Sequence, residues 1–275
     1  NFLTKCISST EKVAIQPIQS EKQPNVSKGQ RYDAVHTGTI VNSVIATFDD
    51  WVTASGSEDG MIVLFDWQSG RAIRRWHGHK RAVNRLAFGT NLGNIFSGSR
   101  DGSVMMWDLN SEDPKQRFVG HELTVNGVSA SSLDDKVIFS GSRDWSVRLW
   151  DVETGKQLHN SKVEWNVVSF LRSIPKEPCA LQASEDLQLR VWDARSMAAP
   201  AQAIKGAHNN IMTCCDVTHD GLYFVSSSNG FDGQGCELKV WDRRTSRLLA
   251  DLAGHQQTVT GCAFLPPARG KHQRG

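Results

Sequence analysis

The sequence lacks the marks of several protein classes. No stretch approaches the ~20 consecutive apolar residues that a membrane-spanning helix requires. Lysine and arginine number 31 against 29 aspartates and glutamates, without a long run of like charge, so we expect neither a nucleic-acid partner nor a transmembrane segment. Residues 1–5 contain neither an initiating methionine nor the apolar core of a signal peptide, which leaves an N-terminal lipid anchor open.

The spacing of a metal site is missing as well. The cysteines form no Cys-x-x-Cys pair, and we expect neither a metal nor a cofactor. Free cysteine packs as a small apolar residue, so reduced, partly buried thiols and an intracellular compartment are expected. The six cysteines are Cys6, Cys179, Cys214, Cys215, Cys236 and Cys262.

What the sequence does contain is an internal repeat. A turn-like segment followed by an aromatic residue and aspartate occurs at residues 56–66, 98–108, 141–151 and 183–193, and a further copy ends at 241–242. The aromatic positions 65, 107, 150, 192 and 241 are 42, 43, 42 and 49 residues apart. A period of about 42 residues indicates tandem structural units.

A second marker shares this period, because histidine, usually after glycine, occurs at positions 36, 79, 121, 208 and 255. The Gly-His…Trp-Asp pattern resembles the WD-repeat family over residues 36–265. The resemblance implies an all-β propeller of about five complete four-stranded blades and a partial sixth, as a truncated form of a seven-bladed propeller. The expected blades lie near residues 36–77, 78–119, 120–160, 161–206 and 207–253, with the partial blade at 254–265.

Alternation within each repeat predicts strands independently of the family. Val104 and Met106 share one parity, and Met105 and Trp107 share the other. One face is therefore aliphatic, and the other packs the indole beside long side chains such as Arg148 and Arg190, whose charges we expect to reach water.

The ends of the chain follow no such period. Residues 1–30 are polar and are predicted to form a disordered or loosely docked arm. The propeller is expected over residues 31–265, and residues 266–275 form a basic tail.

Histidine, serine and aspartate together invite comparison with a hydrolase triad. An active site occurs once per domain, whereas this set recurs with every repeat, so we interpret it as structural and expect no catalytic residue and no enzyme. In WD repeats the turn aspartate binds the histidine, the histidine contacts a serine, and the serine contacts the tryptophan. By resemblance the matching sets are His79, Ser97, Asp101 and Trp107, and His121, Ser140, Asp144 and Trp150.

Other repeats depart from this set. The first has Phe65 in place of tryptophan, which removes the indole donor. The fourth has Val163 and Glu164 where Gly-His is expected and Gln182 at the serine position, and the fifth has Gly235 in place of the turn aspartate. Blades four and five are therefore expected to be less rigidly pinned than blades two and three.

The resemblance implies that partners bind at the end of the propeller rimmed by the loops that carry these markers. Tryptophan and arginine are enriched at binding hot spots. Our hypothesis is a rim cluster that holds an acidic or aromatic-containing peptide; the alternative is a set of solvated rim side chains. The candidates are Arg81, Arg100, Thr124, Arg143, Trp145, Trp165 and Phe231. Phe231 lies on a glycine-rich loop, but no helix pattern follows that loop, so we expect it to bind no nucleotide.

The expected function is a non-enzymatic interaction scaffold with protein or peptide partners. Residues 105–109, 228–237 and 254–266 resemble a cytoplasmic adaptor of this family, which implies cytoplasmic location and a link to cilium-associated trafficking. The alternative is a substrate receptor of a cullin-type ubiquitin ligase, because two segments resemble the Trp-Asp-x-Arg docking signature. These segments contain Trp192, Asp193 and Arg195, and Trp241, Asp242 and Arg244.

Overall fold

The computed structural model describes residues 35–36, 38–46, 52–67, 69–90, 93–133 and 136–265. The described residues form strands and turns, and none of them forms a helix of the length and apolarity needed to cross a membrane. The predicted arm at 1–30 and the basic tail at 266–275 lie outside the described residues.

The chain folds into five antiparallel sheets of four strands, each built from strands that follow one another in sequence. The first is β1 (Val41–Ala46), β2 (Val52–Ser57), β3 (Met61–Asp66) and β4 (Arg71–His77). The second is β5 (Val83–Phe88), β6 (Asn94–Ser99), β7 (Ser103–Asp108) and β8 (Gln116–Val119). The third is β9 (Val125–Ala130), β10 (Val137–Ser142), β11 (Ser146–Asp151) and β12 (Gln157–Lys162). The fourth is β13 (Val168–Ser173), β14 (Cys179–Ser184), β15 (Leu189–Asp193) and β16 (Gln202–Ile204). The fifth is β17 (Met212–Val217), β18 (Tyr223–Ser228), β19 (Leu238–Asp242) and β20 (Arg247–Leu252).

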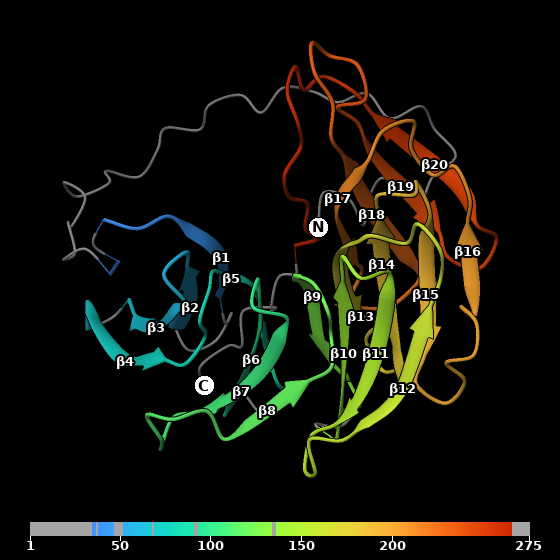
Figure 1. The fold of residues 1–275 in the computed structure, drawn as a ribbon. Coiled ribbons are helices and arrows are strands. Elements are labelled where there is room, and N and C mark those ends of the chain that lie inside the picture. The colour runs from blue at the N-terminus through green and yellow to red at the C-terminus, as the bar shows by residue number, and fades with distance from the viewer. Residues whose placement is uncertain are drawn as a thin grey trace, which may run out of the picture.

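The sheets are arranged as blades around a common axis. Figure 1 shows them as an arc, with blade one and blade five at its two ends. The first strand of each blade contacts the first strand of the next, so β1, β5, β9, β13 and β17 line the axis. This arrangement confirms the predicted all-β propeller with five complete blades.

Residues 253–265 follow β20 and return along the axial strand of blade five. The Thr213 hydroxyl donates to the carbonyl of Val259, and the Phe264 N–H donates to Asp216 at 2.7 Å. An equivalent bond joins blades three and four, where the Asn126 side chain donates to the carbonyl of Val168 at 3.1 Å. This segment therefore lies along β17, where the first strand of a further blade would lie.

Apolar side chains between consecutive blades form the core. One cluster joins blades one and two through Ile62, Leu64, Val83 and Trp107, and three similar clusters join the remaining pairs. The glycine of the repeated Ser-Gly-Ser sets the spacing, because a Cβ at Gly98 would lie 2.7 Å from side-chain atoms of the next blade. Only a residue without a side chain lets the blades approach so closely there.

One expectation about the sheets was wrong. Arg148 and Arg190 do not extend to water; they are 8% and 3% exposed. Both faces of the third strand are covered, since neighbouring blades pack on either side, so the guanidinium groups must find partners inside the protein. Arg148 lies 3.7 Å from Asp144, and Arg190 forms an ion pair with Asp186.

The described cysteines are free thiols. Cys179, Cys214, Cys215 and Cys236 are buried and Cys262 is half-buried, while Cys6 lies outside the described residues. Burial raises the pKa of the Cys179 thiol to about 11, and nearby carboxylates add to that effect.

Candidate functional site

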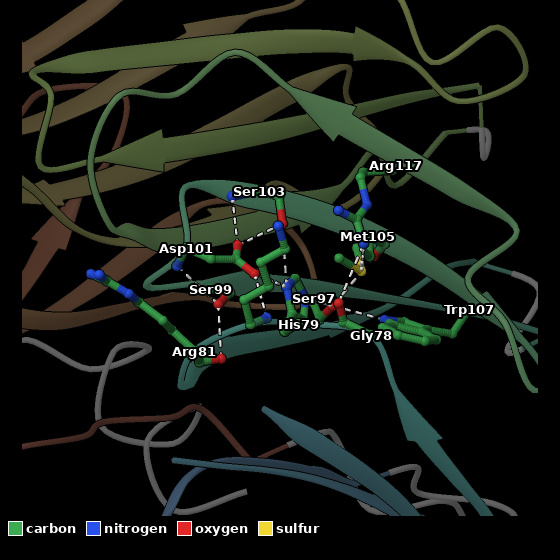
Figure 2. A network of polar contacts seen from close by, with 11 residues as sticks. Gly78, His79, Arg81, Ser97, Ser99, Asp101, Ser103, Met105, Trp107 and Arg117 are labelled. Atoms are coloured by element: carbon green, nitrogen blue, oxygen red, sulfur yellow. Dashed lines mark hydrogen bonds and ion pairs between the residues drawn. The ribbon is translucent and has the colours of Figure 1, made fainter. Parts of the chain in front are cut away.

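The histidine, serine, aspartate and tryptophan of blade two form one connected network (Figure 2). His79 bonds through Nδ1 to Asp101 at 3.1 Å and through Nε2 to the Ser97 hydroxyl at 2.7 Å. The Trp107 indole N–H donates to the same hydroxyl at 2.7 Å. The network therefore ties the outer turn, the second strand and the third strand of the blade together.

Blade three repeats this geometry. His121 lies 2.9 Å from Asp144 and 2.7 Å from the Ser140 hydroxyl, which accepts the Trp150 indole N–H at 2.7 Å. Ser140 is fully buried. A substrate cannot reach a hydroxyl enclosed in this way, so the set has the connections of a hydrolase triad without an accessible nucleophile.

A further serine belongs to each network. The Ser103 hydroxyl donates to Asp101 at 2.6 Å and lies 3.3 Å from His79 Nδ1, and Ser146 does the same in blade three. We did not single out these serines from the sequence. The signal was present, because both follow the turn aspartate by two residues in adjacent repeats.

Electrostatics in the networks follow from burial and hydrogen bonding. Burial alone would raise the pKa of Asp101, but hydrogen bonds from His79, Ser103 and the Lys80 backbone outweigh it and lower the pKa well below its ordinary range. Burial lowers the pKa of His121, partly offset by Asp144. The network of blade three is thus built around an ionised Asp144 and a neutral His121 imidazole.

Blade four replaces the network. Gln182 stands at the serine position; its side-chain oxygen accepts the Trp192 indole N–H at 2.5 Å, and its amide donates to Asn166. Arg190 donates to Asn166 at 2.9 Å and binds Asp186. We predicted no partner for Gln182, whereas the structure connects the blade through a different set of residues.

Blade five keeps only part of the network. The Ser226 hydroxyl lies 2.7 Å from His208 Nε2 and accepts the Trp241 indole N–H at 2.9 Å. Nδ1 of His208 has no hydrogen-bond partner among the described residues, and the Glu237 carboxylate lies 3.8 Å away. Burial, together with the Lys239 charge, lowers the pKa of His208 to about 4.

The predicted binding residues fall into two neighbouring groups on the loops of blades two to four. Arg81, Arg100 and Thr124 line one cavity of about 350 Å³, beside Lys80 and Glu122. Figure 2 shows the Arg81 side chain extending away from the buried network. The carboxylate of Asp101 also lines the cavity, but His79 and the Lys80 backbone already bind it.

The second group lies between blades three and four. The rings of Trp145 and Trp165 are 5.3 Å apart, and Trp165 is 71% exposed. Arg143 forms an ion pair with Glu185 at 3.4 Å, and its backbone N–H donates to the carbonyl of Thr124. That bond places the second group next to the first.

The backbone holds the two tryptophans in an uncommon conformation. The φ angles are 69° at Trp145 and 63° at Trp165, in the left-handed region that most residues avoid. Blades one and two have Gly60 and Gly102 at the position of Trp145, both with positive φ. The turn takes positive φ at this position in blades one to four, and blade three places an indole where glycine would fit without strain.

The remaining candidates lie elsewhere. Phe231 is 73% exposed in blade five, where its backbone pairs with Gln257. Arg195 lies on the turn after β15, with its guanidinium bound to Asp193 at 2.6 Å. Arg244 lies on the matching turn after β19, and its backbone N–H donates to Asp242. The structure therefore brings neither Phe231 nor these arginines into the cluster on blades two to four.

Comparison with known proteins agrees with this architecture. The family model "WD domain, G-beta repeat" matches residues 70–108, 112–151 and 201–242. A chain in a crystal structure of the mitotic checkpoint complex superposes with a TM-score of 0.73 at 22% identity, covering 83% of this chain and 69% of that one. The fold is thus that of a β-propeller, and three of its segments match the WD-repeat model.

Among curated proteins, this chain is similar to nuclear distribution proteins of fungi. It is 30% identical over 221 residues to nuclear distribution protein nudF of Aspergillus niger, covering 80% of this chain and 39% of the relative. It is 35% identical over 237 residues to nudF of Aspergillus terreus, covering 78% and 52%. The chain thus spans between two fifths and about half of the length of these relatives.

Proposed function

We propose that the chain is a non-enzymatic scaffold that binds a protein partner through the loop face of blades two to four. The observation that carries this proposal is the Trp145–Trp165 pair. A large aromatic residue exposed to water gains little from burial, and a left-handed backbone at a non-glycine residue costs on the order of 1–3 kcal/mol. Such strain at a pair formed by the half-buried Trp145 and the exposed Trp165 favours a role in binding.

The chemistry of the face favours an acidic or aromatic-containing peptide. Lys80, Arg81 and Arg100 border one cavity, and the nearby carboxylate of Asp101 is already bound inside its network. The tryptophan pair beside them offers a flat surface for an aromatic side chain. An acidic segment with an aromatic residue would match both halves of the cluster.

The test compares partner capture by the full chain and by an Arg143→Ala/Trp145→Gly double variant, with quantitative mass spectrometry of the captured proteins. Glycine suits this turn in two other blades, so the variant should fold. We expect a subset of partners to be lost, and those partners should share segments rich in aspartate, glutamate and aromatic residues. Identical capture by the folded variant would contradict the proposal.

The relatives support a cytoplasmic scaffold without fixing its pathway. They are named nuclear distribution proteins, which favours a role in placing cellular components. We propose the same class of role here, with cilium-associated trafficking as the particular process. Localisation of the tagged protein in ciliated cells tests that process, and absence of any ciliary defect after depletion would refute it. The lipid anchor left open by the sequence falls in residues outside those described.

The ubiquitin-ligase alternative rests on the exposure of one arginine. The Arg195 side chain is 74% exposed and could reach an adaptor, although Asp193 already binds it. An Arg195→Ala/Arg244→Ala variant is therefore a matched control. It should retain every partner of the loop face, and loss of a ligase adaptor from this variant alone would favour the alternative.

A further inference from the structure

Arg85, in the axial strand β5, is held by contacts from two further blades. Its Nε donates to the carbonyl of Asn126 in β9 at 3.0 Å, and its guanidinium carbon lies 4.1 Å from the ring centroid of Phe170 in β13. The stack and the single bond through Nε fix the plane of the group. In the part of the chain that the structure describes, the terminal amino groups have no hydrogen-bond acceptor.

The charge of Arg85 also lacks a counter-ion among the described residues. Arg85 and Asp216 both line a central cavity of about 720 Å³. The carboxylate of Asp216, however, already binds Arg172 at 2.8 Å and the Phe264 N–H. Burial lowers the pKa of Arg85, but a guanidinium remains protonated in proteins. A partly buried cation without a counter-ion favours binding of an anion from solution.

A second polar group, which lacks a hydrogen-bond partner among the described residues, lines a cavity that Arg85 also lines. Arg85 and Ser169 both line a cavity of about 360 Å³, together with Asn84, Asn126 and Thr213 from neighbouring axial strands. The amide of Asn84 donates to that of Asn126 at 3.1 Å, Asn126 donates to blade four, and Thr213 donates to Val259. The Ser169 hydroxyl is buried and, among the described residues, has no partner.

We propose that Arg85 and Ser169 form an oxyanion site in the cavity of about 360 Å³, at the end of the propeller axis where β5 and β13 begin. We further propose that the ligand of this site carries a carboxylate. A guanidinium whose Nε and one face are occupied presents its terminal amino groups in a plane, which suits the two oxygens of a carboxylate. Glu185 also lines this cavity, paired with Arg143 at 3.4 Å, and its charge disfavours phosphate, which concentrates more than one negative charge on a single group, more than a single carboxylate. The site does not depend on the tryptophan cluster.

The carboxylate has two sources, a free small acid or an acidic side chain of a bound peptide. Titrations of the full chain at constant ionic strength use glutarate for the first and a terminally blocked tetraglutamate peptide for the second, with inorganic phosphate for comparison. NMR follows the Arg85 Nε–H resonance. We expect glutarate, the peptide or both to shift this resonance, and tighter binding of one identifies the source. Tighter binding of phosphate than of either would overturn the carboxylate assignment.

Variants separate a binding site from a structural contact. Arg85→Met should weaken carboxylate binding by about tenfold or more, because a charge-assisted hydrogen bond is lost. Ser169→Ala removes a hydroxyl that holds nothing in the protein, so the fold should stay intact while affinity falls by about threefold or more. Arg247→Met, the same charge change at an exposed arginine of β20, should leave glutarate affinity unaltered. Unchanged affinity in Ser169→Ala, or no shift of the Arg85 resonance with either carboxylate, would overturn the proposal.

Discussion

Blades two and four satisfy equivalent buried polar groups with different side chains. In both, the indole N–H of the third strand must find an acceptor, and the turn aspartate must find donors. Blade two uses the Ser97 hydroxyl and the His79 imidazole, and blade four uses the Gln182 amide and the Arg190 guanidinium. The comparison shows that the buried polar groups of a blade must be hydrogen-bonded, and that several residue types can supply the hydrogen bonds.

The two solutions differ in what remains when one member is removed. Loss of the aspartate in blade two leaves an imidazole, a hydroxyl and backbone N–H groups without their acceptor, whereas its loss in blade four leaves a guanidinium that is 3% exposed. An orphaned neutral donor costs about 1–3 kcal/mol, and an orphaned buried charge costs about 3–5 kcal/mol. Blade four, which the sequence predicted to be the more loosely pinned, should therefore respond more strongly to loss of its turn aspartate.

The largest effect is expected from Asp186→Ala. This change should lower the free energy of unfolding by about 3–5 kcal/mol, because Arg190 stays buried without its counter-ion. Asp101→Ala, the matched change in blade two, should cost about 1.5–3 kcal/mol. Urea unfolding at neutral pH measures both.

A double variant sharpens this test. Asp186→Ala/Arg190→Met removes both charges and should recover most of the stability that the single change loses, since replacing a buried ion pair by apolar groups is often close to neutral. Equal losses in the two single variants, with no recovery in the double variant, would show that the charge in blade four does not matter.

Acid should affect blade five next. The pKa of His208 falls from 6.5 to about 4 on folding, so its contribution to stability is complete above pH 6.5 and is lost as the pH falls from 6.5 to 4. The shift corresponds to about 3 kcal/mol. The lowered pKa values of Asp101 and Asp144 act in the same direction at more acidic pH, below the ordinary range of aspartate.

Stability measured against pH isolates this contribution. His208→Gln should flatten the curve between pH 6.5 and 4, while His219→Gln, a change at an exposed histidine, should leave its slope unaltered. A His208→Gln curve as steep as that of the unaltered protein would place the acid sensitivity in another group.

A smaller effect is expected from the serines. Ser140→Ala should lower the free energy of unfolding by about 1–3 kcal/mol, because both the Trp150 indole and His121 lose their partner. Ser55→Ala in blade one should cost less, since the Phe65 side chain has no N–H donor and, among the described residues, the Ser55 hydroxyl bonds His36 and a carbonyl alone. Equal losses would mean that the indole bond contributes little, and urea unfolding decides between the two.

The repeat was enough to predict the fold, whereas the contacts of residues that depart from the repeat became clear only from the structure. The period of 42 residues and the alternation around Trp107 fix strands and blades, since both follow from local geometry. The role of Asn166 was not predictable, because it lies two residues before β13 whereas His121 lies four residues before β9. The burial of Arg190 depends on packing from both neighbouring blades, which no single repeat reveals.

The binding cluster was predicted in part for the same reason. Residues next to the turn markers could be named from the sequence, including Trp145. The contact between Trp145 and Trp165 could not, since it depends on a left-handed backbone at both residues and on the approach of two loops from different blades.

The smallest effect on stability is expected from Trp145→Gly, where blade three would regain the residue of blades one and two. The change removes an aromatic contact worth about 0.5–1.5 kcal/mol and relieves a left-handed backbone that costs about 1–2 kcal/mol, so the two terms nearly cancel. The thermal midpoint should therefore stay close to that of the unaltered protein while partner binding falls. Leu187→Gly, at the equivalent turn of blade four with a φ of 66°, is the matched control and should leave binding intact. A fall of several kilocalories in Trp145→Gly would instead mean that the indole supports the fold, because a contact needed only by a partner cannot stabilise the free protein.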